Sequence, residues 1–229
     1  MKKSVLKLFA LFIPYLAFTE VKEIVWTELQ VAETRTVISD DSAISFYYTR
    51  EDENYDLFVG VQFASEQTTF DSHGKWIFKK EGRVKLGLEG IFSNEKYSDI
   101  SRRGNYFAGL YSDIRANDRI SVGSDILFGY KTVDYIGLDI ERKWKFDTML
   151  DIFLAWNCFE NGQLKFAIMT RDDFFYQNFG YIIYALSLRN DFDSRISLKV
   201  SYSIRSIDMM TISSYVDGWC AKFTMGYRL

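Results

Sequence analysis

Three adjacent residues, Asp71, Ser72 and His73, are the first candidates for chemistry, because an acid, a serine and a histidine can form a catalytic triad. In such a site the histidine takes the serine proton while the acid orients the imidazole ring. His73 is also the chain's only histidine. Side chains of consecutive residues diverge, however, so neighbours in sequence rarely reach the geometry of a triad. The stretch 71–74 is better explained as a solvated turn, and we expect no enzymatic activity.

Neither the cysteines nor any other residues are spaced as a metal or cofactor site. Cys158 and Cys220 stand outside any Cys-x-x-Cys or Cys/His cluster, so a zinc site is not expected. They can form one disulfide or remain two unpaired strand residues, and the second alternative is favoured. The sequence contains no glycine-rich phosphate loop. We therefore expect no cofactor and no bound metal.

The first 19 residues have the pattern of an export signal. Lys2, Lys3 and Lys7 form a basic end, and residues 8–18 are an apolar run of 11 residues. This run is too short to span a bilayer and suits the core of a signal peptide, with cleavage expected after Thr19. No later stretch is long and apolar enough for a membrane helix. We therefore expect an exported protein that is either soluble or a β-barrel.

Charge and composition exclude some partners and favour strands. The formal net charge is −3, and removal of the leader's three lysines leaves 25 of the 28 basic residues against 31 acidic ones. This balance argues against a nucleic-acid partner, since phosphate binding needs a concentrated basic surface. Aromatic residues make up 17% of the chain, which suits strands with aromatic girdles. The single proline, Pro14, lies in the leader, so the rest of the chain can form an uninterrupted hydrogen-bond ladder.

From residue 43 onward, apolar residues alternate with polar or small ones almost throughout the chain. Successive side chains of a strand point to opposite faces, so this period of two predicts strands with one apolar face. Ten clear strands follow residue 55, and 43–49 and 75–79 are two further candidates. The rest of 65–82 is predicted as a polar loop, and the residues before 43 fit a helix or a strand. The predicted segments are a signal peptide (1–19), an N-terminal segment of uncertain structure (20–42) and a β-barrel (43–229).

Two turns with similar sequences indicate how the strands are connected. Residues 116–121 and 192–197 both place Asp, Asn or Ser before an Arg-Ile-Ser strand start. Turns of this kind on the same side of a barrel require an even number of strands between them. The alternation instead predicts five strands, at 119–130, 133–144, 147–158, 162–171 and 178–189. One of these boundaries is therefore wrong, or the turns face opposite sides; the pattern is most ambiguous in 171–189.

The polar face of the predicted strands carries full charges of both signs. Those expected on it are Arg83, Lys85, Glu89, Asp125, Asp139, Glu141, Arg195, Lys199 and Arg205. A soluble barrel would have to pack its many large apolar side chains inside, which requires a ligand or a second layer. We therefore expect the apolar face to contact lipid and the charges to pair within the lumen. The predicted fold is all-β, an antiparallel up-and-down transmembrane β-barrel of about 10 strands (8–12).

The last predicted strand, 219–229, alternates apolar and polar residues without a break. It resembles the carboxy-terminal assembly signal of bacterial outer-membrane β-barrels at Trp219, Lys222, Phe223, Tyr227 and Leu229. It departs from that signal at Thr224, where glycine is usual, and at its last residue, which is not aromatic. With the leader and the alternation, the chain resembles small bacterial outer-membrane β-barrel proteins. The resemblance implies escort by periplasmic chaperones, insertion by the barrel-assembly machinery, and a monomer surrounded by outer-membrane lipid.

Several functions are compatible with such a barrel. The first expectation is a structural, adhesive or narrow-channel role, with the lumen filled by paired charges. A transporter of small hydrophobic solutes is an alternative, indicated by aromatic residues on the predicted lumen face, namely Phe107, Tyr111, Phe179 and Tyr181. A membrane enzyme that uses His73 and a soluble, exported ligand-binding barrel are the remaining alternatives.

Overall fold

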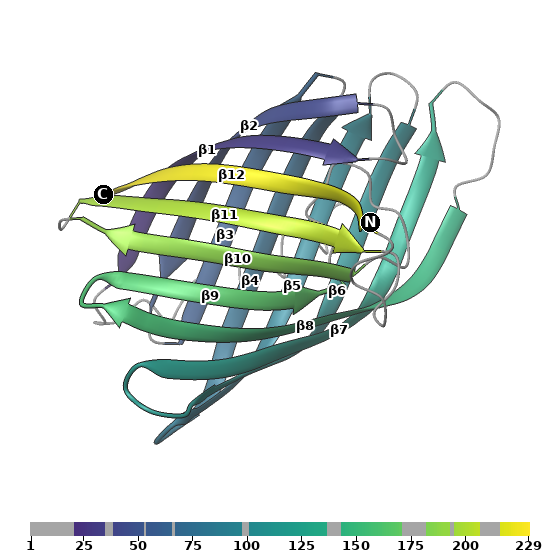
Figure 1. Ribbon diagram of the computed structural model, residues 1–229. Helices are drawn as coiled ribbons and strands as arrows, with labels where there is room; N and C mark the ends of the chain where they lie inside the picture. Colours follow the sequence, from purple (N-terminus) through teal and green to yellow (C-terminus); the bar gives the residue numbers. More distant parts are fainter. Residues whose placement is uncertain are drawn as a thin grey trace.

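The computed structural model contains a closed barrel of twelve antiparallel strands (Figure 1). It describes residues 21–34, 39–52, 54–65, 67–97, 101–136, 143–170, 182–192, 195–206 and 216–229. The strands are β1 (Lys22–Thr34), β2 (Ser39–Glu51), β3 (Tyr55–Ala64), β4 (Gln67–Glu81), β5 (Val84–Tyr97), β6 (Ser101–Arg115), β7 (Ile120–Tyr135), β8 (Lys143–Phe159), β9 (Gly162–Met169), β10 (Ile182–Asp191), β11 (Ile196–Ser206) and β12 (Val216–Arg228). The antiparallel up-and-down barrel is therefore confirmed, with twelve strands instead of about ten. In the part of the chain that the structure describes, no helix is long and apolar enough to cross a bilayer.

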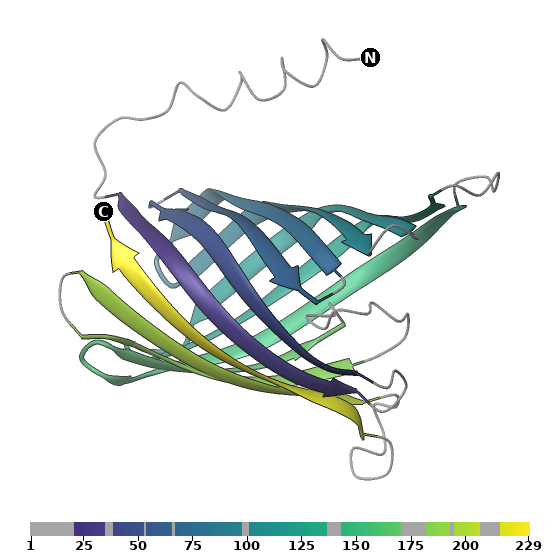
Figure 2. The ribbon, with the colours of Figure 1, turned by 90° about the horizontal axis from the view of Figure 1, so that it is seen from above.

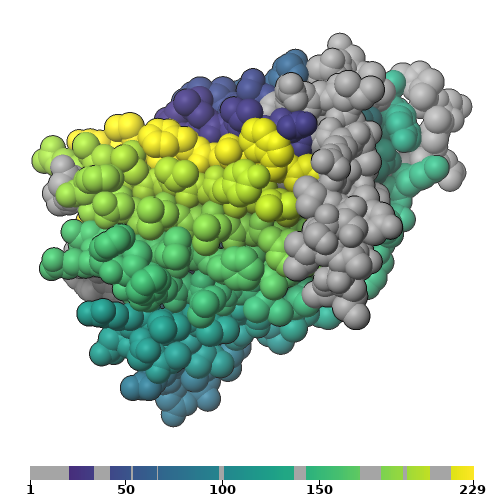
Figure 3. Space-filling view, in the orientation of Figure 1, coloured from purple at the N-terminus to yellow at the C-terminus, as the bar shows by residue number. Residues whose placement is uncertain are grey.

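Most large apolar side chains point out of the barrel, whereas the inward rows are mainly polar or small, with a few large apolar residues such as Trp26 and Phe107 among them. On β12, Phe223 and Met225 are exposed while Cys220 and Thr224 are buried inside. Other exposed apolar residues around the wall include Leu29, Phe46, Phe70, Leu110, Phe128, Ile152, Phe166 and Val200. Figure 3 shows the continuous outer wall that the green-to-yellow strands β9–β12 form. Soluble monomers rarely expose so much apolar surface, so the outer face suits lipid.

The barrel closes where β1 pairs with β12, the yellow strand that lies beside the purple β1 in Figure 2. This first strand lies in the segment 20–42 that the sequence leaves open between helix and strand. Its outward residues Val25 and Leu29 are exposed, and its inward residues Glu28 and Gln30 are buried. The alternation therefore runs through this segment too, and the barrel begins before residue 43.

Four strands, not five, lie between the two similar turns. They are β7, β8, β9 and β10, so both turns lie at the same end of the barrel and the conflict in strand number disappears. The error is the predicted strand 133–144, not the ambiguous region 171–189. Residues 133–135 belong to the end of β7 and residues 143–144 to the start of β8, because both strands are longer than the alternation indicated.

His73 lies in strand β4, and the prediction of a polar loop around it is wrong. Residues 67–81 are all strand, with Asp71 and His73 directed inward. Ser72 stands between them and therefore points to the opposite face. The three side chains cannot form a triad in this geometry. The stretch resembles a loop because outward Thr68, Ser72 and Gly74 interrupt the apolar row of the strand.

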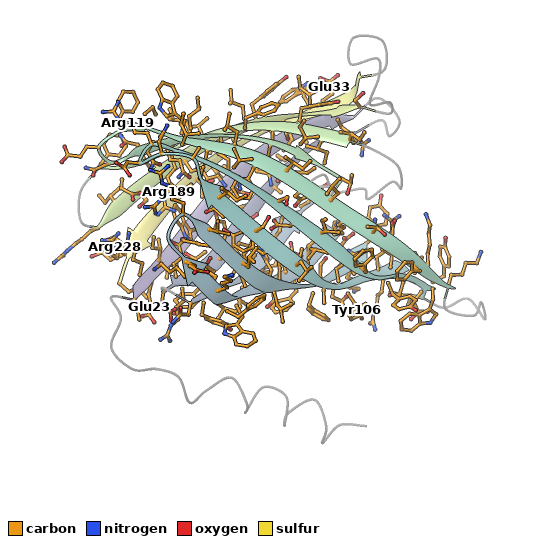
Figure 4. All side chains as sticks on the ribbon, turned by 90° about the horizontal axis from the view of Figure 1, so that it is seen from below. Glu23, Glu33, Tyr106, Arg119, Arg189 and Arg228 are labelled. Atoms are coloured by element: carbon orange, nitrogen blue, oxygen red, sulfur yellow. The ribbon has the colours of Figure 1, made fainter. Side chains whose placement is uncertain are left out.

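The two ends of the barrel differ in the length of their connections. The C-terminus lies at the end that holds the β2–β3, β4–β5, β6–β7, β8–β9 and β10–β11 connections, each of two to four residues. We call this the terminal end. At the opposite, long-connection end, the β7–β8, β9–β10 and β11–β12 connections have 7, 12 and 9 residues, whereas the β1–β2, β3–β4 and β5–β6 connections have 4, 2 and 3. Figure 4 shows Glu23, Arg119 and Arg228 at the terminal end and Glu33 at the other.

This difference predicts which end faces the outside of the cell. Outer-membrane barrels have short periplasmic turns and longer extracellular loops. We expect an epitope tag in the β11–β12 connection to bind antibody on intact cells, and the same tag at Asn161 in the β8–β9 turn to bind only after the envelope is opened. Equal staining of the two tags on intact cells would contradict this orientation.

A row of aromatic side chains crosses four adjacent strands on the outer face, near the long-connection end. Phe92, Tyr106, Tyr130 and Phe146 are direct cross-strand neighbours on β5, β6, β7 and β8 (Figure 4 labels Tyr106). The rings of Phe92 and Tyr106 meet edge-on at 5.4 Å between centroids, and those of Tyr130 and Phe146 at 5.5 Å. Such a row is the girdle that membrane barrels place at the lipid–water interface.

Candidate functional site: the lumen

The lumen contains a cavity of about 540 Å³. Its lining residues come from β1–β9, β11 and β12, so the cavity is the interior of the barrel and not a surface cleft. Along β4 the lining runs from Gln67 to Lys75, which is roughly 26 Å at about 3.3 Å per residue. The cavity therefore follows more than half the length of this strand.

Acidic side chains outnumber basic ones in this lining. The eight acids are Glu28, Glu51, Asp56, Asp71, Glu89, Glu95, Asp125 and Asp151, and the four lysines are Lys75, Lys165, Lys199 and Lys222. A surplus of one sign in a cleft with low-dielectric walls creates a focused potential. In this lining the surplus consists of carboxylates.

Lys75 reaches across the inner face of the sheet from β4 to β7. Its Nζ lies 3.1 Å from Oε2 of Glu89 on β5 and 3.3 Å from Oδ2 of Asp125 on β7. The same ammonium group lies 4.2 Å from the ring centroid of Tyr111 on β6. Glu89 is 4% exposed and Asp125 is 6% exposed, so one lysine compensates two nearly buried carboxylates. We call these four residues the Lys75 bridge.

A second polar network crosses the seam between β1 and β12. The hydroxyl of Thr224 donates a hydrogen bond to Oε2 of Glu28 at 3.0 Å, and Nζ of Lys222 lies 3.7 Å from Oε1 of the same carboxylate. The Tyr47 hydroxyl on β2 shares a hydrogen bond with Thr224. These contacts join three neighbouring strands at the closure and hold Glu28 against the wall.

A third network holds Glu95 near the long-connection end. Nε2 of Gln67 donates to Oγ1 of Thr69 at 3.0 Å and to Oε2 of Glu95 at 3.3 Å. Nδ2 of Asn105 donates to the other oxygen of Glu95 at 3.2 Å. The carboxylate is thus oriented by amide groups from both neighbouring strands. Within the described part of the chain, Oε1 of Gln67 accepts no hydrogen bond.

Aromatic rings line the inner wall of β1 to β4. The centroids of Trp26 and Tyr47 are 5.9 Å apart, those of Tyr47 and Phe58 4.9 Å, and those of Phe58 and His73 4.2 Å. The guanidinium carbon of Arg189 lies 5.3 Å from the Trp26 ring, and Nη1 lies 3.8 Å from Oε1 of Glu51. The imidazole is therefore one member of a stack of rings, which is a packing role.

Two apolar clusters narrow the lumen. One consists of Ile91, Phe107, Leu127 and Met149 on β5 to β8. The other contains Ala32, Ala43, Ile183 and Cys220, with Ala64, Met169 and Ala185 packed against it. The second cluster joins β1–β3 with β9 and β10, which lie on different parts of the wall. Because Cys220 of this cluster lies on β12, the cluster follows one side of the wall from β3 through β1 and β12 to β9 and takes up part of the lumen there.

The predicted lumen charges fall into three groups. Glu89 and Asp125 belong to the Lys75 bridge, Lys199 lines the cavity, Lys85 is half-buried on β5, and Arg205 on β11 is fully buried. Arg83 and Arg195 instead lie exposed in turns at the terminal end, because β5 and β11 begin after them. Nη1 of Arg83 donates to the carbonyl oxygen of Ala116 at 3.0 Å. Asp139, Glu141, Phe179 and Tyr181 lie outside the described residues.

Several residues of the lumen were not among the predicted ones. Lys75 was placed at the start of a short strand, away from the charges it contacts, and Glu28 lies in the segment left open. A signal existed for Glu28, since Val25, Leu29 and Val31 alternate with it and with Gln30. Nothing in the sequence indicates that Lys75 meets Asp125, because 50 residues separate them.

The proposed assembly residues all belong to β12 or follow it directly. Phe223 and Tyr227 point outward, Leu229 follows the strand, and Lys222 points inward to Glu28. Nε1 of Trp219 donates a hydrogen bond to Oε2 of Glu33 on β1 at 2.8 Å. Their recognition by assembly machinery stays a prediction.

The two cysteines lie at different ends of the barrel and are not joined by a disulfide. Cys158 is near the end of β8, where its Sγ contacts the carbonyl oxygen of Gly162 at 3.7 Å. Cys220 is buried on β12, opposite Ala32. Among the described residues, no group of three or more His, Cys, Asp or Glu side chains has the arrangement of a metal site.

Comparison with known proteins gives structural but not sequence relatives. No family model and no curated protein matches the chain. The NanC porin superimposes with a TM-score of 0.62 and 7% identity over 90% of this chain and 100% of that one. The KdgM porin, also solved in complex with disordered oligogalacturonate, gives 0.58 and 12% identity over 89% and 99%. The translocator domain of the autotransporter NalP from Neisseria meningitidis gives 0.52 and 11% identity over 100% and 95%.

The chain has the fold of a bacterial outer-membrane β-barrel. At these identities the likeness concerns the fold alone, so the function of this barrel has to be argued from the residues of its own lumen.

Proposed function

We propose that this outer-membrane barrel is a narrow channel that prefers cations to anions. The observation that carries the proposal is the lumen cavity, with its eight carboxylates against four lysines. The lining includes Glu51 and Asp56 near the terminal end and Gln67 and Glu95 near the long-connection end. A path lined by polar side chains, most of whose charged members are acidic, thus follows the barrel axis.

We expect the channel to be narrow because other side chains occupy part of the barrel interior. The Lys75 bridge and the two apolar clusters occupy parts of the lumen, and the cavity itself is about 540 Å³. Single-channel steps in the picosiemens range are therefore expected, as for pores in which permeating ions pass charged side chains singly. A lumen filled by paired charges and a narrow channel differ only in how much open space remains between the charged side chains.

The charge of the lining also distinguishes this barrel from the KdgM porin. Oligogalacturonate, which that porin holds, carries a carboxylate on each sugar. Eight lining acids would repel such a polyanion. We therefore do not extend that ligand to this chain. A path for hydrophobic solutes is not supported either, since Phe107 packs in an apolar cluster and Tyr111 lies under Lys75.

The direct test uses the full chain refolded in detergent and inserted into planar bilayers of neutral lipid. Under a tenfold KCl gradient, we expect picosiemens steps whose reversal potential shifts toward the K⁺ equilibrium potential. A shift toward the Cl⁻ potential, or steps of nanosiemens size, would contradict a narrow cation channel. Complete absence of current from heat-modifiable, folded protein would favour a structural or adhesive role.

Delivery to the outer membrane belongs to the same proposal. We assign the signal peptide at 1–19 to export and the outward aromatic residues of β12 to recognition by barrel-assembly machinery. Phe223 and Tyr227 support this assignment, because both are exposed on the lipid-facing side where a second protein can reach them.

A further inference from the structure

Carboxylates recur at several depths along the lumen. Glu51 and Asp56 stand near the terminal end, and Glu95 stands near the long-connection end. Between them, Asp125 and Asp151 occupy directly opposite positions on β7 and β8. Like charges placed opposite each other are unfavourable unless cations compensate them, and the ammonium group of Lys75 does so for Asp125 at 3.3 Å. A cation with more than one charge along its length would meet successive carboxylates.

Two buried acceptor atoms of the lining lack a donor among the described residues. They are Oε1 of Gln67 and Oδ1 of Asp125, on side chains that are 7% and 6% exposed. Both residues line the cavity. Buried polar atoms of native proteins normally have a hydrogen-bond partner, so these two positions suit a solute or water that donates N–H or O–H bonds. An ammonium group supplies such donors together with positive charge.

Apolar side chains separate the acidic positions of the lining. They include Phe58, Ile91, Met149 and Met169. A small hydrated metal ion gains nothing from such surfaces, whereas a chain of methylene groups is stabilised by contact with them. The lining therefore alternates between two kinds of contact that a linear alkylammonium ion combines in one molecule.

One alkylammonium group of the protein itself, the side chain of Lys75, already makes both kinds of contact. The side chain of Lys75 extends through the lumen, and its Nζ meets two carboxylates and the face of Tyr111. Lys165 repeats the aromatic half of this arrangement, with Nζ 4.1 Å from the ring centroid of Phe153. The lumen thus provides the environment in which alkylammonium groups are stable: carboxylates beside aromatic and apolar walls.

From these observations we infer that the channel takes linear di- and polyammonium ions, the chemical class of the polyamines. The inference rests on the proposed cation channel and adds the substrate class. Carboxylates bind the ammonium groups, and the apolar lining contacts the methylene chain between them.

The experiment compares spermidine with Mg²⁺ as blockers of the K⁺ current in neutral planar bilayers. We expect spermidine to halve the current at a concentration about tenfold lower than Mg²⁺ requires, as burial of two methylene groups would give. The block should weaken at high voltage as spermidine passes through. Equal potency of spermidine and Mg²⁺ would overturn the inference while leaving the cation channel intact. Absence of any K⁺ current would instead reject the channel, and this inference with it.

Substitutions test whether spermidine blocks the K⁺ current from within the lumen. Asp125→Asn should raise the half-blocking spermidine concentration about tenfold, the factor that loss of one charge-assisted hydrogen bond produces. Asp56→Asn serves the same purpose at a half-buried position if the first variant folds poorly. Asp118→Asn is the matched control, because Asp118 is exposed in the β6–β7 turn and should leave the block unchanged. An unchanged block in both lumen variants would overturn the assignment.

Discussion

Replacing Lys75 by Gln lowers the free energy of unfolding of the barrel by about 3 kcal/mol, because removal of one partner leaves buried charges uncompensated. The carboxylates of Glu89 and Asp125 have side chains only 3% and 9% exposed, whereas that of Lys75 is 22% exposed. The partial exposure of Lys75 places the expected loss at the low end for a buried pair. Urea unfolding in detergent micelles, followed by tryptophan fluorescence, measures it.

A lysine four residues further along the same strand provides the control. Lys79 pairs with Glu81 at 3.1 Å, but the two side chains are 52% and 78% exposed. Lys79→Gln should therefore change stability by less than about 1 kcal/mol, as exposed pairs do. The double variant Lys75→Gln/Asp125→Asn should recover part of the loss, since one buried charge is removed with its partner. Equal unfolding midpoints for the two single lysine variants would show that the Lys75 bridge carries no stability.

The same variant alters ion selectivity. With Gln at position 75, eight carboxylates face three lysines in the cavity lining, and the ion pair from β4 to Asp125 on β7 is lost. The ratio of K⁺ to Cl⁻ permeability should therefore rise together with the conductance. A Lys75→Gln channel that is more anion-permeable than the parent would contradict the assigned sign of the lumen.

Gly109→Ala prevents the barrel from closing normally and costs about 3 kcal/mol or more, at the upper end of overpacking effects. A Cβ atom at this inward position on β6 would overlap the carbonyl oxygen of Ile126 on β7 and lie 2.7 Å from the Cα of Leu127. These are backbone atoms of a paired strand, so neither can move without breaking the ladder. Refolding into micelles should give less of the heat-modifiable folded band, with a lower urea midpoint.

A neighbouring glycine tests whether the effect is specific. At Gly90 on β5 an added Cβ would have its nearest neighbour at 4.0 Å, the carbonyl oxygen of Phe107. Gly90→Ala should be neutral or stabilising by up to about 1 kcal/mol, because alanine restricts the unfolded chain more than glycine does. If the two alanine variants refold equally well, close backbone approach is not what requires glycine at position 109.

The sequence contains enough to predict the wall of the barrel but not the contacts inside it. Alternation identifies a strand wherever the outward row is strongly apolar, as in β12 with Phe223, Met225 and Tyr227. It fails in β4, where outward Thr68, Ser72 and Gly74 dilute that row, so a strand looks like a loop. In β1 the inward Ile24 and Trp26 make both faces partly apolar, and the period becomes ambiguous.

The interior depends on distances that the linear pattern does not contain. Whether Lys75 reaches Asp125 is determined by how β4 to β7 lie side by side in the curved wall, where Lys75 extends over Tyr111 of β6. The charges of the inner face can be identified one by one from alternation. Their partners require the closed, tilted geometry of all twelve strands.

Closure between the first and last strands has a consequence for biogenesis. The contacts at the seam join residues that are 186 and 196 positions apart, Glu33 with Trp219 and Glu28 with Thr224. A partly synthesised or truncated chain lacks one side of this pairing and exposes two open strand edges, which are sites of aggregation. The first and last strands must come together before these contacts can stabilise the barrel. The seam therefore cannot form hairpin by hairpin.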